Sequence, residues 1–225
     1  MRIVRALLFD VFGTCVDWRA SIIQAAARFG LPAELADAWR AQYQPQLETV
    51  RNGSRPWVNL DVLHRIGLNR VLDDLDRQLS EADRAELTLA WHRLDPWPDV
   101  VEGLTRLKER YVIAPCSNGH IAQSVNVAKH AGLPWDAILG AEIAQAYKPD
   151  PAVYLKSVHA LGLEPRDVCM VAAHNGDLFA AQALGLRTAF VARPTEHGPH
   201  QTTDLEPEGD YDVAATDFRR LAAWF

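Results

Sequence analysis

Five short apolar runs, separated by longer stretches with helical spacing, constrain the fold of this chain most strongly. The runs are VRALLFD (4–10), YVIAPCS (111–117), DAILGA (136–141), VCMVAA (168–173) and RTAFVA (187–192). Near-continuous apolar runs, each followed by an amphipathic segment, are typical of parallel strands that are buried on both faces. The sequence therefore predicts an α/β fold with a doubly wound, Rossmann-like parallel sheet.

The long segment between the first two runs breaks this alternation. Residues 18–97 show no strand pattern, but they contain four stretches with helical apolar spacing: SIIQAAARF, LADAWRAQYQPQLETV, VNLDVLHRI and EADRAELTLAWHRL. Two prolines in Asp95-Pro-Trp-Pro98 then end the helical pattern. We therefore expect a helical cap at residues 16–97, inserted after the first strand into a catalytic core formed by residues 1–15 and 98–225.

Composition and charge argue against several classes of protein. The 48% hydrophobic and 23% charged residues are typical of an ordinary globular protein, and the net charge of −6 gives no basic surface for nucleic acid. The first apolar run meets Asp10 without a cleavage site, and no apolar segment is long enough to span a bilayer. We expect a cytoplasmic protein without a nucleic-acid or membrane partner.

The cysteines support a reducing compartment. Cys15, Cys116 and Cys169 are too few and too scattered for a disulfide framework or a CxxC metal site. Cys116 and Cys169 stand in apolar runs, where a free cysteine behaves as a small buried hydrophobic residue.

Polar residues follow four of the predicted strands at their carboxyl ends. In an open parallel sheet, ligands bind beyond these ends, so the residues there are candidates for one site. Each has a structural alternative as a helix cap, a solvated charge or a turn residue, but their common location favours a site. The candidates are Asp10 with Thr14, Ser117 with Asn118, Lys148 in the loop 147–151, and His174 with Asp177.

These residues fall into a known set of motifs. Asp10-Val-Phe-Gly-Thr14, Ser117-Asn118, Lys148-Pro149 and Gly176-Asp177, with a helical insertion after the first, resemble the four motifs of the haloacid dehalogenase superfamily. The resemblance covers essentially the whole chain. Phe12, the pair Trp39-Arg40 and Lys148-Pro-Asp-Pro-Ala-Val-Tyr154 are similar to the type II (S)-2-haloacid dehalogenases. This resemblance implies a hydrolase acting on carbon–halide bonds, a short 2-haloacid substrate and a homodimer; we expect no metal or other cofactor.

Phe12 bears on the choice between phosphate and halide chemistry. Phosphatases of the superfamily use a carboxylate at this position to protonate an alkoxide, a strong base that leaves poorly unaided. A halide is a very weak base and leaves without a proton. An aromatic residue at position 12 removes the phosphatase acid and adds an apolar wall for a small organic substrate, so it favours carbon–halogen cleavage.

The resemblance also implies the roles of the site residues. Asp10 attacks the α-carbon with inversion and forms an ester, which water hydrolyses to release a 2-hydroxy acid. Arg40 is assigned to the halide, although a surface position on an amphipathic helix is nearly as good an interpretation of this residue. The other assignments are Lys148 to the ionisation of Asp10, Thr14 and Asn118 to the positioning of polar atoms, and Ser117 to the substrate carboxylate.

One loop departs from the family pattern. Ala172-Ala173-His174 stands where well-known haloacid dehalogenases carry Ser-Ser-Asn. His174 is therefore expected to serve either as a base for ester hydrolysis, when neutral, or as a donor to the departing halide, when protonated. Asp177 would orient the water or His174, or pair with Lys148. The altered loop leaves the preferred halogen open, including fluoride.

Two other functions stay open at this stage. A Mg²⁺-dependent, phosphatase-like hydrolase would use Asp10, the backbone carbonyl of residue 12 and Asp177 as oxygen ligands. A non-catalytic binding protein on this fold is the second alternative. The tryptophans of the insertion are expected to pack between cap and core, and the polar loop 197–210 is expected to be only surface. These tryptophans are Trp39, Trp57, Trp91 and Trp97.

Overall fold

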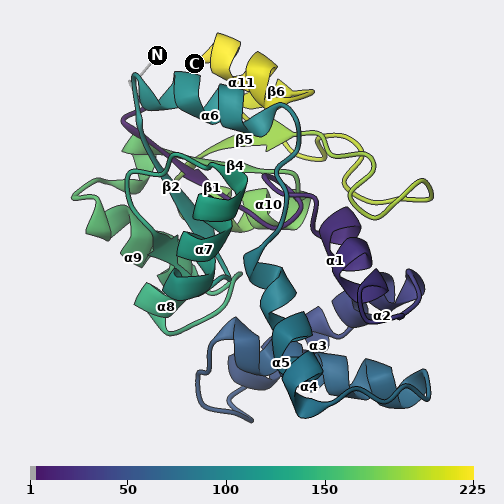
Figure 1. Ribbon diagram of the computed structural model, residues 1–225. Coiled ribbons are helices and arrows are strands. Elements are labelled where there is room, and N and C mark those ends of the chain that lie inside the picture. Colours follow the sequence, from purple (N-terminus) through teal and green to yellow (C-terminus); the bar gives the residue numbers. More distant parts are fainter. Residues whose placement is uncertain (1–3) are drawn as a thin grey trace.

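The computed structural model describes residues 4–225 and contains a six-stranded sheet with helices on both faces (Figure 1). All neighbouring strands are parallel, and their order is β3-β2-β1-β4-β5-β6. This arrangement confirms the predicted doubly wound α/β fold. The strands are β1 (Ala6–Phe9), β2 (Val112–Ser117), β3 (Leu139–Gly140), β4 (Val168–Ala172), β5 (Arg187–Val191) and β6 (Val213–Ala215).

Both faces of the sheet are buried, which explains the near-continuous apolar runs. Along β1, Leu7 and Phe9 belong to one hydrophobic cluster, and Ala6 and Leu8 belong to the other. Helices α6 (Val100–Lys108), α7 (Ile121–Ala131) and α11 (Phe218–Trp224) pack in the first cluster, whereas α9 (Pro151–Ala160) and α10 (Asn175–Ala183) pack in the second. Short helices α8 (Ala141–Ala144) and η2 (Pro165–Asp167) complete the connections.

The predicted strands are all present, but two details of the sheet differ. The third strand has only two residues, and Asp136 before it accepts a hydrogen bond from the backbone N–H of Ile113 at 2.9 Å through its side chain. The edge strand β6 was not predicted from the sequence. It has three residues, and its middle residue Ala214 is exposed, so it gives no apolar run.

A cap of helices follows β1 and lies to one side of the sheet (Figure 1). Three of its helices begin with a capping side chain, from Asp17, Asn59 and Ser80. The division into cap and core at residues 16 and 97 stays a prediction. The cap contains α1 (Trp18–Ala27), α2 (Glu34–Ala41), α3 (Tyr43–Arg51), α4 (Leu60–Asp74), α5 (Glu81–Thr88) and η1 (Leu89–His92).

The two segments that connect cap and core run side by side. The backbone N–H of Asp17 donates to the carbonyl of Asp95 at 2.9 Å, and that of Trp97 donates to the carbonyl of Cys15 at 3.1 Å. The cap therefore leaves and re-enters the core at one place.

Three of the four tryptophans contact the core, as expected, and Trp39 is the exception. Trp91 is almost fully buried and meets the Phe12 ring edge-on at a centroid distance of 6.2 Å. Trp57 stacks on Tyr147, and the indole N–H of Trp97 donates to the carbonyl of Gly13. Trp39 packs within the cap, where it meets Trp91 edge-on.

The three cysteines are buried with free thiols. Within residues 4–225, no helix combines the length and apolar character needed to cross a membrane.

Candidate active site

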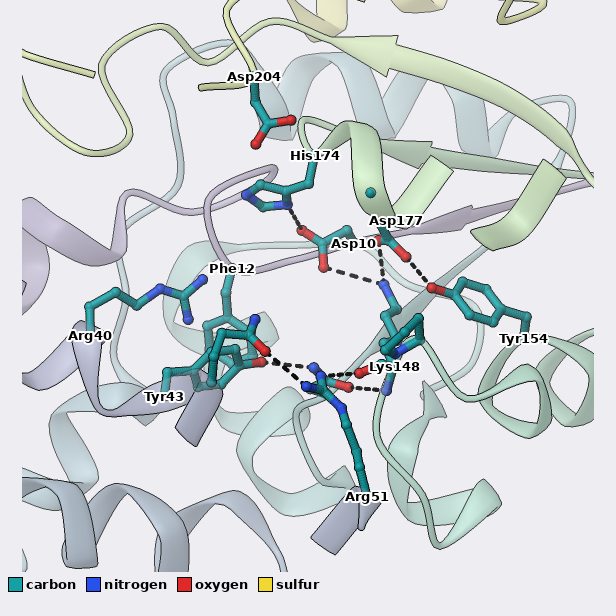
Figure 2. Close-up of a pocket in the computed structure, with 14 residues that line it drawn as sticks. Asp10, Phe12, Arg40, Tyr43, Arg51, Lys148, Tyr154, His174, Asp177 and Asp204 are labelled. Atoms are coloured by element: carbon teal, nitrogen blue, oxygen red, sulfur yellow. Dashed lines mark hydrogen bonds and ion pairs between the residues drawn. The ribbon is translucent and has the colours of Figure 1, made fainter. Parts of the chain in front are cut away.

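Three side chains converge on the carboxylate of Asp10, and Figure 2 shows two of them, His174 and Lys148. Asp10 follows β1 directly, and its backbone N–H bonds to the carbonyl of Val171 at 2.9 Å. The Thr14 hydroxyl donates to Asp10 Oδ2 at 2.8 Å, and His174 Nδ1 lies 3.2 Å from the same oxygen. Lys148 Nζ lies 3.4 Å from Oδ1. Asp10 is 8% exposed, so these groups form most of its polar environment.

Lys148 lies between two carboxylates. Its Nζ is 2.6 Å from Asp177 Oδ2, and Tyr154 donates its hydroxyl proton to Asp177 Oδ1 at 2.5 Å. The backbone N–H of Lys148 donates to Asn118 Oδ1 at 2.8 Å. Lys148 is therefore fixed both by its backbone N–H and by its ammonium group. Asp177 therefore pairs with Lys148; the alternative that it orients His174 does not match the structure, because the imidazole faces other carboxylates.

His174 lies between Asp10 and a second acid, Glu196. His174 Nε2 is 2.8 Å from Glu196 Oε2, and the Trp18 indole N–H donates to Glu196 Oε1 at 2.9 Å. Glu196 is 1% exposed. Glycine at position 13 allows Glu196 to approach the backbone this closely. The φ of Gly13 is +91°, and a Cβ there would lie 2.1 Å from Glu196 Oε1. The sequence analysis missed Glu196, since no local pattern marks it.

The polar loop 197–210 is not only surface, which corrects the expectation from the sequence. Asp204 within it lines the cavity beside Asp10 and accepts a hydrogen bond from the backbone N–H of Asn175 at 2.7 Å. The loop reaches the site because it connects β5 to β6 at the carboxyl edge of the sheet.

Electrostatics keep the carboxylate of Asp10 ionised. Burial raises the pKa of this carboxyl, but the charges of Lys148 and His174 outweigh burial and hold the pKa below its usual value. Burial likewise disfavours the ammonium of Lys148, whereas Asp177 and Asp10 raise its pKa above the usual value. For Asp177, burial and the nearby charge of Asp10 raise the pKa.

The surroundings of His174 favour its imidazolium form. Burial lowers its pKa, but Glu196 and Asp10 outweigh burial and raise the pKa well above the ordinary value. The pKa of Glu196 is lowered by His174 in spite of burial, which by itself would raise it. Both ring N–H groups then point to carboxylates, one on each side of the ring.

A cavity of about 400 Å³ opens beside Asp10 and is lined by both core and cap. Phe12 lines it from the loop after β1, as predicted for an apolar wall. Arg40 lines it from α2, so the surface position considered for this residue does not apply. The Arg40 guanidinium lies 4.2 Å from the Tyr43 ring centroid and 5.2 Å from that of Trp18, and its Nη1 is buried without a hydrogen-bond partner in residues 4–225.

The pair Ser117-Asn118 divides between two environments. Asn118 lines the cavity, and its Nδ2 donates to the Tyr43 hydroxyl at 2.9 Å. Ser117 is fully buried at the end of β2, accepts a hydrogen bond from the Gly119 N–H at 3.2 Å and is absent from the cavity wall. The expected contact of Ser117 with a substrate carboxylate is not supported by this position, because the side chain is fully buried and lies outside the cavity wall.

Two further cap residues reach the site without having been predicted. Tyr43 begins α3, and Arg51 ends it. Arg51 lines the cavity and donates to the backbone carbonyl of Lys148. Tyr154 was noted only as part of a motif, and its contact with Asp177 gives it a place in the site.

The carboxylates that a cation would bind are already paired. Lys148 Nζ contacts both Asp10 and Asp177, the two side chains that a phosphatase-like Mg²⁺ site would use. An ammonium group thus supplies the positive charge between them. The site is defined by a buried, ionised carboxylate at the end of a parallel strand, a lysine and a histidine beside it, and a cavity lined by core and cap residues.

Comparison with known proteins identifies the class of protein that has such a site. A family model described as haloacid dehalogenase-like hydrolase matches residues 4–185, and the chain belongs to this family. The crystal structure of a defluorinating L-2-haloacid dehalogenase is 50% identical with a TM-score of 0.95, covering 98% of this chain and 94% of that one. A second L-2-haloacid dehalogenase structure is 48% identical with a TM-score of 0.95, covering 98% of both chains.

A curated relative extends the comparison. (S)-2-haloacid dehalogenase 4A of Burkholderia cepacia is 28% identical over 91% of this chain and 94% of its own length. The predicted superfamily and fold are confirmed, and the predicted enzyme class, a hydrolase acting on carbon–halide bonds, is supported by all three relatives.

Proposed function

We propose that this protein converts short 2-haloalkanoic acids, haloacetates or (S)-2-haloacids, to 2-hydroxy acids through an ester on Asp10. The observation that carries the proposal is the environment of Asp10, a buried carboxylate kept ionised by Lys148 and His174 at the wall of a cavity. Phe12 stands where a phosphatase needs its acid. The names of the similar proteins support the 2-haloacid substrate and its configuration.

In the first step, an Asp10 oxygen attacks the α-carbon and the halide leaves with the electron pair of the carbon–halogen bond. Oδ2 is engaged by both Thr14 and His174, whereas the one polar contact of Oδ1 within the described part of the chain is with Lys148 at 3.4 Å. Oδ1 is therefore the nucleophilic oxygen, because fewer of its lone pairs are held by donors. The step needs no general acid, consistent with Phe12.

The anionic groups of substrate and product meet cationic side chains of the cap. Arg40 offers a buried Nη1 that has no partner among the described residues, and its guanidinium is held flat by Tyr43 and Trp18. A halide ion or a carboxylate at this nitrogen would satisfy its free N–H. Arg40 therefore receives an anion of the reaction.

In the second step, water attacks the aspartyl carbonyl. Ester formation removes the negative charge facing His174 Nδ1, which lowers the pKa of the ring, while Glu196 continues to accept from Nε2. The Nδ1 proton then leaves to solvent and accounts for the acid released with the halide. Neutral His174 accepts one proton from the attacking water as the water oxygen bonds to the aspartyl carbon. The acyl–oxygen bond then breaks, the departing alkoxide takes the second water proton, and the 2-hydroxy acid leaves Asp10 as a carboxylate beside the restored imidazolium.

A halide-release assay tests this function. An ion-selective electrode should detect halide from at least one of fluoroacetate, chloroacetate and the two enantiomers of 2-chloropropionate, in excess EDTA and not with Asp10→Asn. Hydrolysis of an aryl phosphate only with Mg²⁺, and no halide release, would instead identify a phosphatase. Absence of both activities in folded protein would favour the binding-protein alternative.

Three further statements belong to the same proposal. The protein acts in the cytoplasm, where its three cysteines stay reduced, and without a metal in the catalytic step; it acts as a homodimer, as the family resemblance implies. Light scattering coupled to size exclusion measures the assembly, and a mass near 25 kDa, that of one chain, would contradict the dimer.

A further inference from the structure

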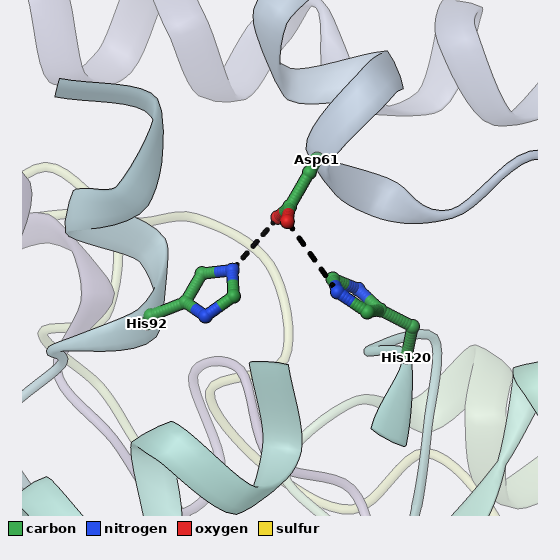
Figure 3. A group of neighbouring side chains, drawn as sticks. All are labelled: Asp61, His92 and His120. Atoms are coloured by element: carbon green, nitrogen blue, oxygen red, sulfur yellow. Dashed lines mark hydrogen bonds and ion pairs between the residues drawn. The ribbon is translucent and has the colours of Figure 1, made fainter. Parts of the chain in front are cut away.

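A second group of ionisable side chains lies where cap and core meet, outside the wall of the Asp10 cavity (Figure 3). Asp61 comes from the first turn of α4 in the cap, and His92 is the last residue of η1. His120 is the N-cap residue of α7 in the core. The three side chains come from segments far apart in sequence, and Figure 3 shows both imidazoles pointing toward the Asp61 carboxylate.

The geometry of this group approaches that of a metal centre. His92 Nε2 is 2.8 Å from Asp61 Oδ1, His120 Nε2 is 3.4 Å from Oδ2, and the ligand atoms all lie within 4.8 Å of one another. In a tetrahedral site with bonds of about 2.1 Å, neighbouring ligand atoms lie about 3.4 Å apart. Shifts of about 1 Å or less would therefore accommodate a metal ion among the three side chains.

Hydrogen bonding leaves one of these imidazoles poorly satisfied. His120 is 4% exposed, its Nδ1 has no partner among the described residues, and its only polar contact is the long one to Asp61. A buried imidazole normally has better partners. His92 is supported on its other side, since Asn126 Nδ2 lies 2.9 Å from its Nδ1. Rotation of this amide presents an oxygen to Nδ1–H and frees the Nε2 lone pair for a metal.

The donor set identifies the class of metal. Two imidazole nitrogens and one carboxylate suit borderline divalent ions such as Zn²⁺, Co²⁺ and Ni²⁺, whereas Mg²⁺ and Ca²⁺ prefer oxygen ligands. The Asp61 side chain is 28% exposed, which leaves a path for an ion from solvent.

We propose that Asp61, His92 and His120 bind one Zn²⁺ or similar divalent transition metal ion, which links the cap to the core. The ion replaces the two imidazole–carboxylate hydrogen bonds with coordinate bonds to α4, η1 and the start of α7. Three protein ligands leave a position for water. Because α7 follows the loop that carries Asn118, metal binding also holds the cap against the cavity wall.

Isothermal titration of metal-free, tag-free protein with Zn²⁺ tests the site. We expect saturable binding of one ion that is weakened by at least about 100-fold in both His92→Gln and His120→Gln, because each loses a direct ligand. The melting temperature should rise by roughly 5–10 °C at free Zn²⁺ of about 100 times Kd. Co²⁺ should give visible absorption bands that are lost in the same variants.

A matched control separates this site from other metal binding. His130 lies 2.8 Å from Asp95 in an exposed pair, so His130→Gln removes a histidine next to an aspartate without touching the cluster. This variant should keep the affinity for Zn²⁺ and the Co²⁺ spectrum. The proposal is overturned if wild-type protein shows no saturable binding, or if His92→Gln and His120→Gln bind as tightly as His130→Gln. Either result would reduce the cluster to a hydrogen-bonded contact between cap and core.

Discussion

Replacement of Lys148 by methionine tests the electrostatic part of the mechanism. Lys148 Nζ lies 3.4 Å from Asp10 Oδ1, and the two side chains are 9% and 12% exposed. Two unit charges at this distance interact by about 4–5 kcal/mol at an effective dielectric constant near 20. If the reactive carboxylate loses this stabilisation, kcat/KM at pH 7 should fall by about 10³-fold.

The pH profile of the Lys148→Met variant gives a second, independent result. Lys148 is the largest of the charges that lower the pKa of Asp10 against burial. Without it the pKa rises, so the nucleophile becomes protonated at a higher pH and the acid limb of kcat/KM moves upward. In the wild-type enzyme the same limb lies at lower pH, because activity is lost only as the pH falls through the lowered pKa.

The assay is halide release from a 2-chloroacid between pH 4 and 9, with circular dichroism to show that each variant is folded. Lys129→Met, which removes an exposed lysine of α7, is the control and should behave as the wild type. A folded Lys148→Met enzyme with a rate and acid limb near those of Lys129→Met would show that Lys148 does not keep Asp10 ionised.

Three further substitutions probe the site and its support. His174→Ala should allow the first step but not the second, so mass spectrometry should detect a substrate-minus-halide adduct; failure before the adduct, most severe with fluoride, would assign His174 to the halide. Asp99→Ala should lower the free energy of unfolding in urea by about 3–5 kcal/mol, because it leaves Arg193, bound by two hydrogen bonds of 2.9–3.0 Å, buried and unpaired. Gly13→Ala should lower both stability, by more than about 1 kcal/mol, and turnover, because a Cβ at φ +91° displaces Glu196 from His174.

Each of these substitutions has an outcome that contradicts its basis. A His174→Ala enzyme with full activity on every haloacid would leave this histidine without either role. The exposed pair Glu102–Arg219 is the control for Asp99, and Glu102→Ala should leave the unfolding midpoint unchanged. Equal effects of Asp99→Ala and Glu102→Ala on the free energy of unfolding would mean that the buried Asp99–Arg193 pair does not stabilise the fold. Normal turnover in Gly13→Ala would show that catalysis does not need the contact between Glu196 and His174.

The part of the site that follows from strand order was predictable from the sequence. Asp10, Lys148 and Asp177 come together because the carboxyl ends of parallel strands share one edge, so a pattern of apolar runs places the residues that follow them. Ser117 also lies at the end of a parallel strand, but it does not line the cavity. A position at a strand end does not fix the direction of the side chain.

The remaining residues of the site depend on packing between distant segments. Tyr43 and Arg51 reach the cavity only because the cap helices dock over the sheet edge, and Glu196 reaches His174 only because the chain folds back after β5. None of these positions carries a local signal in the sequence. The same reason applies to β6, whose pairing with β5 is set by the path of the preceding loop.

In the proposed mechanism, Asp10 forms a covalent ester that water cleaves at the aspartyl carbonyl. Single-turnover hydrolysis of a 2-haloacid in H₂¹⁸O, with enzyme in excess, tests it directly when the peptide containing Asp10 is analysed by mass spectrometry. The mechanism predicts that one ¹⁸O enters the Asp10 carboxylate and that the 2-hydroxy acid carries none. Label in the product alone, with an unlabelled Asp10 peptide, would show that water attacks the substrate carbon directly and would contradict the mechanism.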